Sequence, residues 1–182
     1  MKTLLPFLIL TLGSASCNRS KQNKKTLDFG AFTIVTLKGW TKLEGHDQDF
    51  YVGRIKIDSY DTLYFDLGWY SDDLSEFQKL EMADGKIYYV NVSDTSKDVK
   101  LLDSTEIDKL KKSTVTWDYI DGHKAKILRP IKSGLGVTGI YIDSLWKTGS
   151  DYDRFNFFGT DMKPENEQVF LLALKTLKFK KK

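Results

Sequence analysis

The stretch 115–129 constrains the fold of this chain more than any other. Two β-prone runs, 115–120 and 124–129, flank the tripeptide Asp121-Gly122-His123. Asp-Gly readily adopts the positive φ angles that a tight hairpin turn needs, so the two runs are predicted to pair as antiparallel strands. Pro130 follows directly and has no backbone N–H, so it should end the pairing of the second strand on at least one side.

Similar β-prone runs fill much of the remaining chain. We expect strands at 31–36, 50–57, 62–67, 87–92, 136–142 and 152–158, with a short extended segment at 177–179. The cluster Asp58-Ser59-Tyr60-Asp61 should turn the second of these strands into the third. The glycines at 134, 136 and 139 have no following Lys-Ser/Thr, so we interpret them as positions of bending and close backbone approach, and not as a phosphate loop.

Three segments carry helical signals. The clearest is 164–176, where Thr160 or Asp161 is a candidate cap, Pro164 opens the helix, and an apolar stripe follows at Val169, Leu172, Ala173 and Thr176. A second helix is expected from Ser71 to Gly85, because capping residues precede apolar positions spaced at helical intervals. A short third helix is expected at 104–112, and 93–100 should be a surface loop.

Strand pairs combined with helices predict an α+β fold, a mostly antiparallel β-sheet with flanking helices. Four stretches support a closer resemblance: "FGAFTIVTLKGW" at 29–40, "WDYIDGHKAKI" at 117–127, "GVTGIYI" at 136–142, and a closing helix that runs into "LKTLKF" at 174–179. They resemble the Mog1/PsbP/DcrB-like group of small α/β/α sandwiches. The resemblance implies such a sandwich and a binding or assembly role, and it brings no catalytic residue with it.

The N-terminus has the layout of an export signal. Lys2 precedes an apolar run at 4–12, and small residues at 13–16 lead to Cys17, the single cysteine of the chain. The apolar run is shorter than the ~20 residues of a spanning helix. The segment resembles a bacterial lipoprotein signal, which implies cleavage after residue 16 and a lipid on Cys17. The alternative is ordinary secretion with a free thiol on Cys17.

Charge divides the rest of the chain into three parts. The full chain carries a net charge of +3, yet basic residues gather at 18–25 and at 178–182, so the body between them is acidic. We expect 17–25 to be a lipid-anchored basic linker beside the membrane and 26–182 to be one α+β domain. Nucleic acid is not an expected partner, because an acidic body would repel it.

Few residues suggest catalysis or metal binding. The histidines are His46 and His123, and the polar group His46-Asp47-Gln48-Asp49 could hold only part of a metal site, so no metal and no cofactor is expected. The acids Asp58, Asp61, Asp66, Asp72 and Asp73 lack the spacing of a calcium loop and are interpreted as turn and capping residues. A pair of distant carboxylates brought together by folding remains an alternative catalytic site.

Aromatic residues supply the candidate ligand site. Tyr64 and Trp69 belong to the first hairpin, and Trp117 and Tyr119 to the second, where alternation turns some rings toward solvent. Core packing and strand pairing are the competing explanation for them. The triplets that begin at Asp61, Asp103 and Asp143 are similar to the O-glycosylation motif of exported Bacteroidetes proteins.

Taken together, these features predict an exported lipoprotein of the Bacteroidetes type, held through Cys17 at the periplasmic face of the outer membrane. Its expected role is non-enzymatic binding or scaffolding, with an envelope protein or a glycan as partner. The alternative is a carboxylate-based hydrolase acting on envelope or glycan substrates.

Replacement of the cysteine tests the anchor. The variant Cys17→Ser should lose incorporation of a radiolabelled fatty acid and leave the membrane fraction, because no other thiol in the chain can take the lipid. Labelled lipid that remains on the variant would show that the anchor lies elsewhere.

Overall fold

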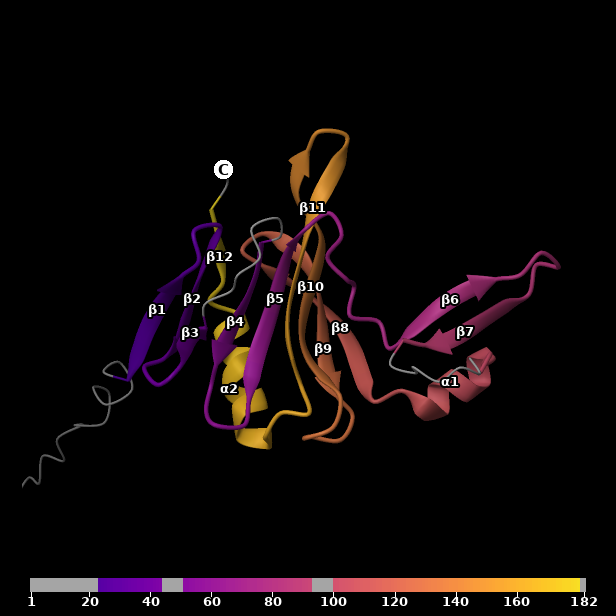
Figure 1. Cartoon of the computed structure of the whole chain (residues 1–182), viewed down its shortest axis with the longest axis horizontal. Helices are drawn as coiled ribbons and strands as arrows, with labels where there is room; N and C mark the ends of the chain where they lie inside the picture. The colour runs from indigo at the N-terminus through magenta and orange to yellow at the C-terminus, as the bar shows by residue number, and fades with distance from the viewer. Residues whose placement is uncertain (1–22, 44–50, 93–99, 181–182) are drawn as a thin grey trace, which may run out of the picture.

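The described part of the chain has an α+β fold in which every paired strand is antiparallel. The computed structural model describes residues 23–43, 51–92 and 100–180, which hold two helices and mostly β-strands (Figure 1). The predicted class, a mostly antiparallel sheet with helices, is confirmed. The expectations for the signal at 1–16, for Cys17, for His46 and for most of the loop at 93–100 fall outside the described residues.

The main layer is a seven-stranded sheet. Its strands run in the order β3-β4-β5-β11-β10-β9-β8. Their bounds are β3 Thr41–Leu43, β4 Tyr51–Lys56, β5 Thr62–Gly68, β8 Ser113–Ile120, β9 His123–Pro130, β10 Val137–Thr148 and β11 Asp151–Thr160. The predicted Asp-Gly hairpin is confirmed, because Asp121 and Gly122 have φ angles of 50° and 85° between β8 and β9.

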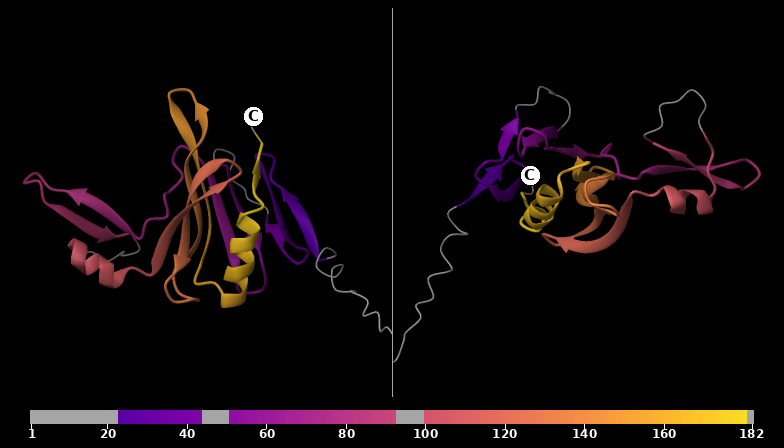
Figure 2. Two further views of the ribbon diagram at one scale, coloured as in Figure 1. Left: turned by 180° about the vertical axis from the view of Figure 1, so that it is seen from behind. Right: turned by 90° about the horizontal axis from the view of Figure 1, so that it is seen from below.

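A second layer covers one face of this sheet. It consists of helix α2, Pro164–Leu174, and of a three-stranded sheet in the order β1-β2-β12. The strands of that sheet are β1 Lys24–Asp28, β2 Phe32–Leu37 and β12 Lys178–Phe179. Figure 2 shows α2 and β12 on the same side of the main sheet. Strand β1 begins inside the range 17–25 that was expected to be a linker.

Phenylalanine rings join the two layers. Phe32 of β2 lies 4.9 Å from Phe65 of β5 and 5.0 Å from Phe155 of β11, measured between ring centroids. Phe157 of β11 lies 5.1 Å from Phe170 of α2. All five side chains are almost completely buried, so the core lies between the main sheet and the second layer.

A separate arm projects beside the main sheet. It comprises the hairpin of β6, Phe77–Glu81, and β7, Ile87–Asn91, together with helix α1, Ser104–Leu110 (Figure 1). Reciprocal backbone hydrogen bonds of 2.9 Å between Tyr89 and Leu102 tie the hairpin to the segment before α1. The arm places α1 beside the main sheet, so the sheet face opposite the core carries no helix of the described residues.

The prediction of a helix from Ser71 to Gly85 was wrong, since strand β6 lies in this range. The expected capping residues make other bonds instead. The Ser71 hydroxyl donates to the Arg154 carbonyl of the main sheet, and the Asp73 carboxylate accepts from the N–H and hydroxyl of Ser75 in a local turn. Leu74 between them has a φ of 59°, which ends any helical path. The short helix expected at 104–112 is confirmed as α1, with Asp103 as its cap.

Helix α2 begins as expected at Pro164 but is capped differently. Neither Thr160 nor Asp161 caps it: the Asp161 carboxylate accepts from the Gly136 N–H, and the Asp61 carboxylate accepts from the Lys163 N–H at the start of α2. The buried face also differs from the predicted stripe. Leu172 is 68% exposed, and the buried apolar residues are Phe170, Ala173 and Leu174.

Gly139 of β10 is a close-approach position, as the sequence suggested. A Cβ at Gly139 would lie 2.7 Å from Phe158 Cβ and 2.8 Å from Phe158 Cα, whereas a Cβ at Gly68 would meet nothing within 4 Å. We expect Gly139→Ala to lower the free energy of unfolding by about 1–3 kcal/mol through overpacking, and Gly68→Ala to cost much less. Urea denaturation of both variants measures the difference, and equal stabilities would contradict the interpretation.

Candidate functional site

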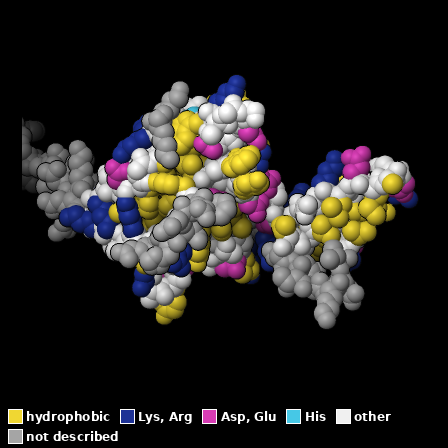
Figure 3. Space-filling model, turned by 45° about the horizontal axis from the view of Figure 1, so that its top comes forward, with side chains coloured by type: hydrophobic (Ala, Val, Ile, Leu, Met, Phe, Trp, Pro, Cys, Tyr) yellow, Lys and Arg dark blue, Asp and Glu magenta, His cyan; other side chains and the backbone are white. Residues whose placement is uncertain are grey.

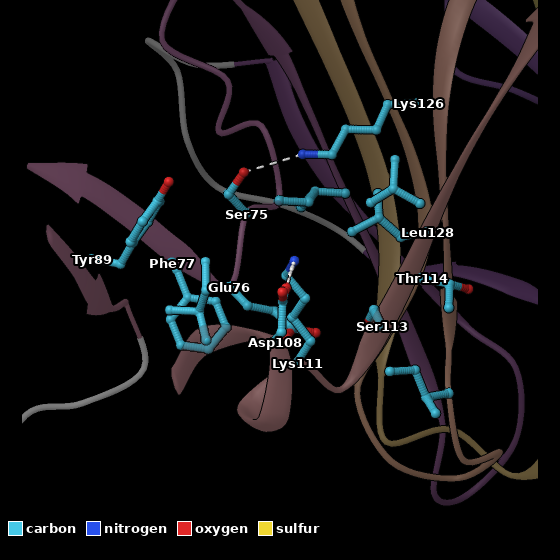
Figure 4. Close-up of a pocket in the computed structure, with 14 residues that line it drawn as sticks. Ser75, Glu76, Phe77, Tyr89, Asp108, Lys111, Ser113, Thr114, Lys126 and Leu128 are labelled. Atoms are coloured by element: carbon cyan, nitrogen blue, oxygen red, sulfur yellow. Dashed lines mark hydrogen bonds and ion pairs between the residues drawn. The ribbon is translucent and has the colours of Figure 1, made fainter. Parts of the chain in front are cut away.

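A groove lies between the arm and the main sheet. It has a volume of about 620 Å³ and opens where β8 and β9 face β6, β7 and α1. Apolar side chains from both sides line it: Leu74, Phe77, Tyr89, Ile107, Val115, Leu128 and Ile131. Figure 4 shows Phe77 and Tyr89 on the arm side and Leu128 on the sheet side. We call this hollow the arm groove.

Lys126 is the most enclosed cation of the arm groove. Its ammonium group donates to the Asp73 carbonyl at 2.8 Å and to the Ser75 hydroxyl at 3.2 Å, and it lies 3.6 Å from the Asp73 carboxylate. Partial burial opposes ionisation of Asp73, but the hydrogen bonds from Ser75 and the charge of Lys126 hold the pKa of its carboxyl below its ordinary value. Lys126 therefore fastens the segment that crosses the sheet to β9.

Glu76 joins the arm to the main sheet at the base of the groove. One carboxylate oxygen accepts from the Lys112 N–H at 2.8 Å, and the Glu76 carbonyl accepts from the Val92 N–H at 3.1 Å. The other carboxylate oxygen is buried and has no hydrogen-bond partner among the described residues. A buried oxygen of this kind is unusual in proteins and marks Glu76 for a functional test.

Leu74, which lines the groove, lies in a strained backbone conformation. Its φ of 59° is rare for a branched side chain, yet the side chain is buried and lines the groove. Strain of this kind costs of the order of 1–3 kcal/mol and persists only where the surroundings enforce it. Here the bonds that Asp73 and Ser75 make with Lys126 hold the adjoining backbone to the sheet.

The four candidate aromatic residues are exposed but do not form one site. Trp117 and Tyr119 lie on the same face of β8, where Lys124 places its ammonium 4.7 Å above the Trp117 ring. Tyr64 lies on β5, separated from β8 by β11, β10 and β9, and it stacks on Phe158. Trp69 follows β5 and packs against Tyr70 at 4.8 Å.

Two of the acidic residues from the sequence form a structural joint with α2. Asp58 accepts from the N–H groups of Tyr60 and Asp61 and pairs with the Lys163 ammonium at 3.0 Å. The amide of Asn166 donates to both carboxylates, at 3.0 Å to Asp58 and 2.7 Å to Asp61. This agrees with the turn and capping role expected for them.

The other acids do not form a catalytic pair. Burial raises the pKa of Asp66, and the nearby charge of Asp72 adds to the rise, whereas the neighbouring polar groups of Ser71 and Leu67 oppose it. Asp66 lies on β5, and strands β11 and β10 separate it from β9, the strand of Lys126. Glu76 and Asp108 lie near the arm. Asp108 is already paired with Lys111 at 2.6 Å.

Metal and membrane features are also limited in the residues that the structure describes. His123 packs edge-on against Phe179 at 5.6 Å. Within 23–43, 51–92 and 100–180, no three His, Cys, Asp or Glu side chains are grouped as metal ligands. A membrane-spanning helix is likewise absent from these ranges, because none of their helices is long and apolar enough to cross a membrane. Of the residues directly after Asp in the three Asp-Ser/Thr triplets, Ser104 and Ser144 are exposed and Thr62 is half-buried.

Sequence reasoning did not identify the residues of the arm groove. Leu74 and Phe77 were assigned to a helix face, and Leu128 and Ile131 carried no signal beyond the end of a strand. Residues from several elements line this groove, so it depends on the angle between the arm and the sheet, which no local sequence pattern encodes. Val115 and Leu128 are cross-strand partners, and the hairpin pattern predicted that pairing.

The joint between Asp58 and α2 predicts a pH effect. Hydrogen bonds from Asp61 and Tyr60, followed by those from Asn166 and Lys163, strongly lower the pKa of Asp58. Because the folded-state pKa lies below the unfolded value of about 3.9, the stabilisation is complete above that pH and is lost as pH falls toward the folded-state pKa.

We therefore expect Asp58→Asn to be less stable than the original chain at pH 7 and the difference to shrink below about pH 4. The exposed Asp143, which has no ion pair within the described ranges, supplies the control Asp143→Asn. Thermal unfolding across pH measures both variants. A difference that does not depend on pH would rule out the ionised Asp58 as its source.

Comparison with known proteins does not add a family to these observations. No family model, no curated protein and no solved structure matches the chain. The features that bear on function are therefore the arm groove, the strand β8 beside it and the charges around them.

Proposed function

We propose that this protein is a non-enzymatic binding module of the cell envelope, anchored through Cys17 at the periplasmic face of the outer membrane, and that the arm groove is its binding site. The observation that carries the proposal is the composition of the groove: seven apolar or aromatic side chains surround about 620 Å³. A concave, largely apolar site with a few polar groups is the usual form of a binding site.

The surface of the arm supports the same proposal. Large apolar side chains are exposed along it, at Met82, Ile87, Val92, Leu101 and Leu110. Figure 3 shows hydrophobic side chains gathered on the arm, next to the body of the protein. Exposed apolar clusters of this kind typically mark contact surfaces. A partner that enters the groove would cover part of this surface as well.

The resemblance to the Mog1/PsbP/DcrB-like group is part of the proposal. The closing helix and its following strand, α2 and β12, are the elements that support it, and the group's members are generally binding, assembly or uncharacterised proteins. The position of α1 beside the sheet is the element that differs from an α/β/α sandwich.

A carboxylate-based hydrolase is the second candidate, and Glu76 is the residue that favours it. Glu76 is one of the residues that line the groove, and one of its carboxylate oxygens is buried without a partner among the described residues. Asp108, the other carboxylate of the groove, is held by Lys111. Hydrolysis of an envelope glycan that is lost in Glu76→Gln would favour this candidate over a binding module.

Photo-crosslinking from the groove tests the main proposal. A benzophenone amino acid replaces Ile131, which lines the groove and is 60% exposed, or Tyr152 near the start of β11, which is 44% exposed. On irradiation in intact cells, we expect discrete covalent adducts with an envelope component from position 131 and a much lower yield from position 152. Equal yields from both positions, or none from position 131, would overturn the assignment of the groove.

A further inference from the structure

Strand β8 is the long, open edge of the main sheet. It spans eight residues at one end of the strand order, and its six central residues are all exposed. The opposite edge, β3, has only three residues. Proteins commonly shorten or cover their sheet edges, because an exposed edge offers unpaired N–H and C=O groups to another strand. The edge at β8 is therefore a place where another chain can add.

The hairpin determines which peptide groups of β8 point outward. A two-residue turn closes on a hydrogen-bonded pair, here Ile120 and His123, so alternate residues of β8 bond to β9. Val115 and Trp117 lie at the other positions, and their N–H and C=O groups point away from β9. No other described strand lies beside them. The Tyr119 N–H, which also points outward, is taken by the Asp118 carboxylate.

Hollows lie on both faces of this edge. On one face, Val115 borders the arm groove. On the other face, a smaller hollow of about 80 Å³ lies between β8, β9 and α2, with Thr116, Ile127 and Leu171 among its lining residues. Side chains of an extended strand alternate between two faces. A strand added to β8 would therefore direct successive side chains toward the two hollows in turn.

The charges around β8 favour an acidic strand. Five nearby cations have no ion-pair partner within the described residues: Lys112, Lys124, Arg129, Lys132 and Lys175. Arg129 and Lys175 line the smaller hollow. Fewer acids lie near the edge: Asp118 accepts from the Tyr119 N–H, Asp108 pairs with Lys111, and Glu76 accepts from the Lys112 N–H and keeps one buried oxygen without a partner among the described residues. A second copy of this chain would bring the same cations together, and like charges across an interface are unfavourable.

We propose that β8 receives an extended, acidic segment of a partner protein as an additional strand of the main sheet, with apolar side chains entering the arm groove. Main-chain hydrogen bonds to Val115 and Trp117 would supply affinity, and the hollows and cations would supply selectivity. This inference rests on the proposed function, because it specifies the partner of the same groove.

Peptide binding to the full-length chain in detergent micelles tests the inference. The probes are two arrays of octapeptides with Val, Leu or Tyr at alternate positions; the positions between are Glu in one array and Lys in the other. We expect retention on the Glu array only. Amide hydrogen exchange should show new protection at Val115 and Trp117 when the best Glu peptide is present. No retention, or equal retention on both arrays, would overturn the inference.

Two pairs of variants locate the contact. Val115→Pro removes an outward N–H at an edge position that tolerates proline and should abolish binding, whereas Val115→Ala, which keeps the N–H, should retain most of it. The double variant Arg129→Glu/Lys175→Glu should bind the Glu peptide at least about tenfold more weakly. Its control, Lys56→Glu/Lys147→Glu, makes the same charge change at exposed sites away from β8 and should bind normally. Equal binding by both double variants would contradict the charge argument.

The remaining outcomes separate this inference from the proposed function. If the Glu peptide fails to bind while crosslinking from position 131 persists, the proposal of a binding module is retained and the proposal of an added strand is overturned. If crosslinking from position 131 fails as well, the groove itself is not the binding site. A concentration-dependent dimer that is lost in Val115→Pro would show that β8 pairs with a second copy of the chain. This result would overturn the proposal of an acidic partner segment.

Discussion

The packing of Phe32 against the main sheet is the interaction on which the rest of the structure depends. Its ring touches rings from β5 and β11, and Phe157 extends the cluster to Phe170 of α2. Aromatic pairs in such edge-to-face arrangements each contribute roughly 0.5–1.5 kcal/mol beyond the area that they bury. Because the second layer is fixed on this face alone, the opposite face of the sheet is left without a covering layer.

The uncovered face explains why the crossing segment and the arm are arranged as they are. The segment after β5 crosses this face and is held by polar contacts: the Ser71 hydroxyl bonds to Arg154, the Asn156 amide to the Asp72 carbonyl, and the Lys126 ammonium to Asp73 and Ser75. The arm begins where this segment ends. A two-stranded hairpin is marginally stable alone, so the arm depends on α1 and on the side chains that it shares with the arm groove.

Electrostatics divides the body into two regions with different roles. At the start of α2, the carboxylates of Asp58 and Asp61 are satisfied by Lys163 and Asn166, so charge there serves stability. Around β8, cations outnumber acids and most have no ion-pair partner in the described ranges. The average charge of the chain conceals this contrast, because basic residues that are distant in sequence come together beside one edge of the sheet.

The sequence alone determined the fold class and much of the local structure. Asp121-Gly122 specified a hairpin because its residues tolerate positive φ angles, and Pro164 with its following acids specified the start of α2. Local patterns failed at Ser71-Asp72-Asp73, because the Ser71 hydroxyl and the Asp72 backbone carbonyl instead bond to the sheet across more than eighty residues of sequence. They also failed to place Leu172, because the buried face of a helix is chosen by the layer against which it packs.

Only the tertiary structure decided the candidate site. Trp117 and Tyr119 were identified as exposed aromatics, but the sheet order separates them from Tyr64 and Trp69. The arm groove combines Leu74, Phe77, Ile107 and Leu128, which are distant in sequence. The open edge at β8 likewise follows from strand order, since a strand's own residues do not state whether a neighbour lies on its second side. Sequence patterns are local, whereas the groove and the edge are products of long-range packing.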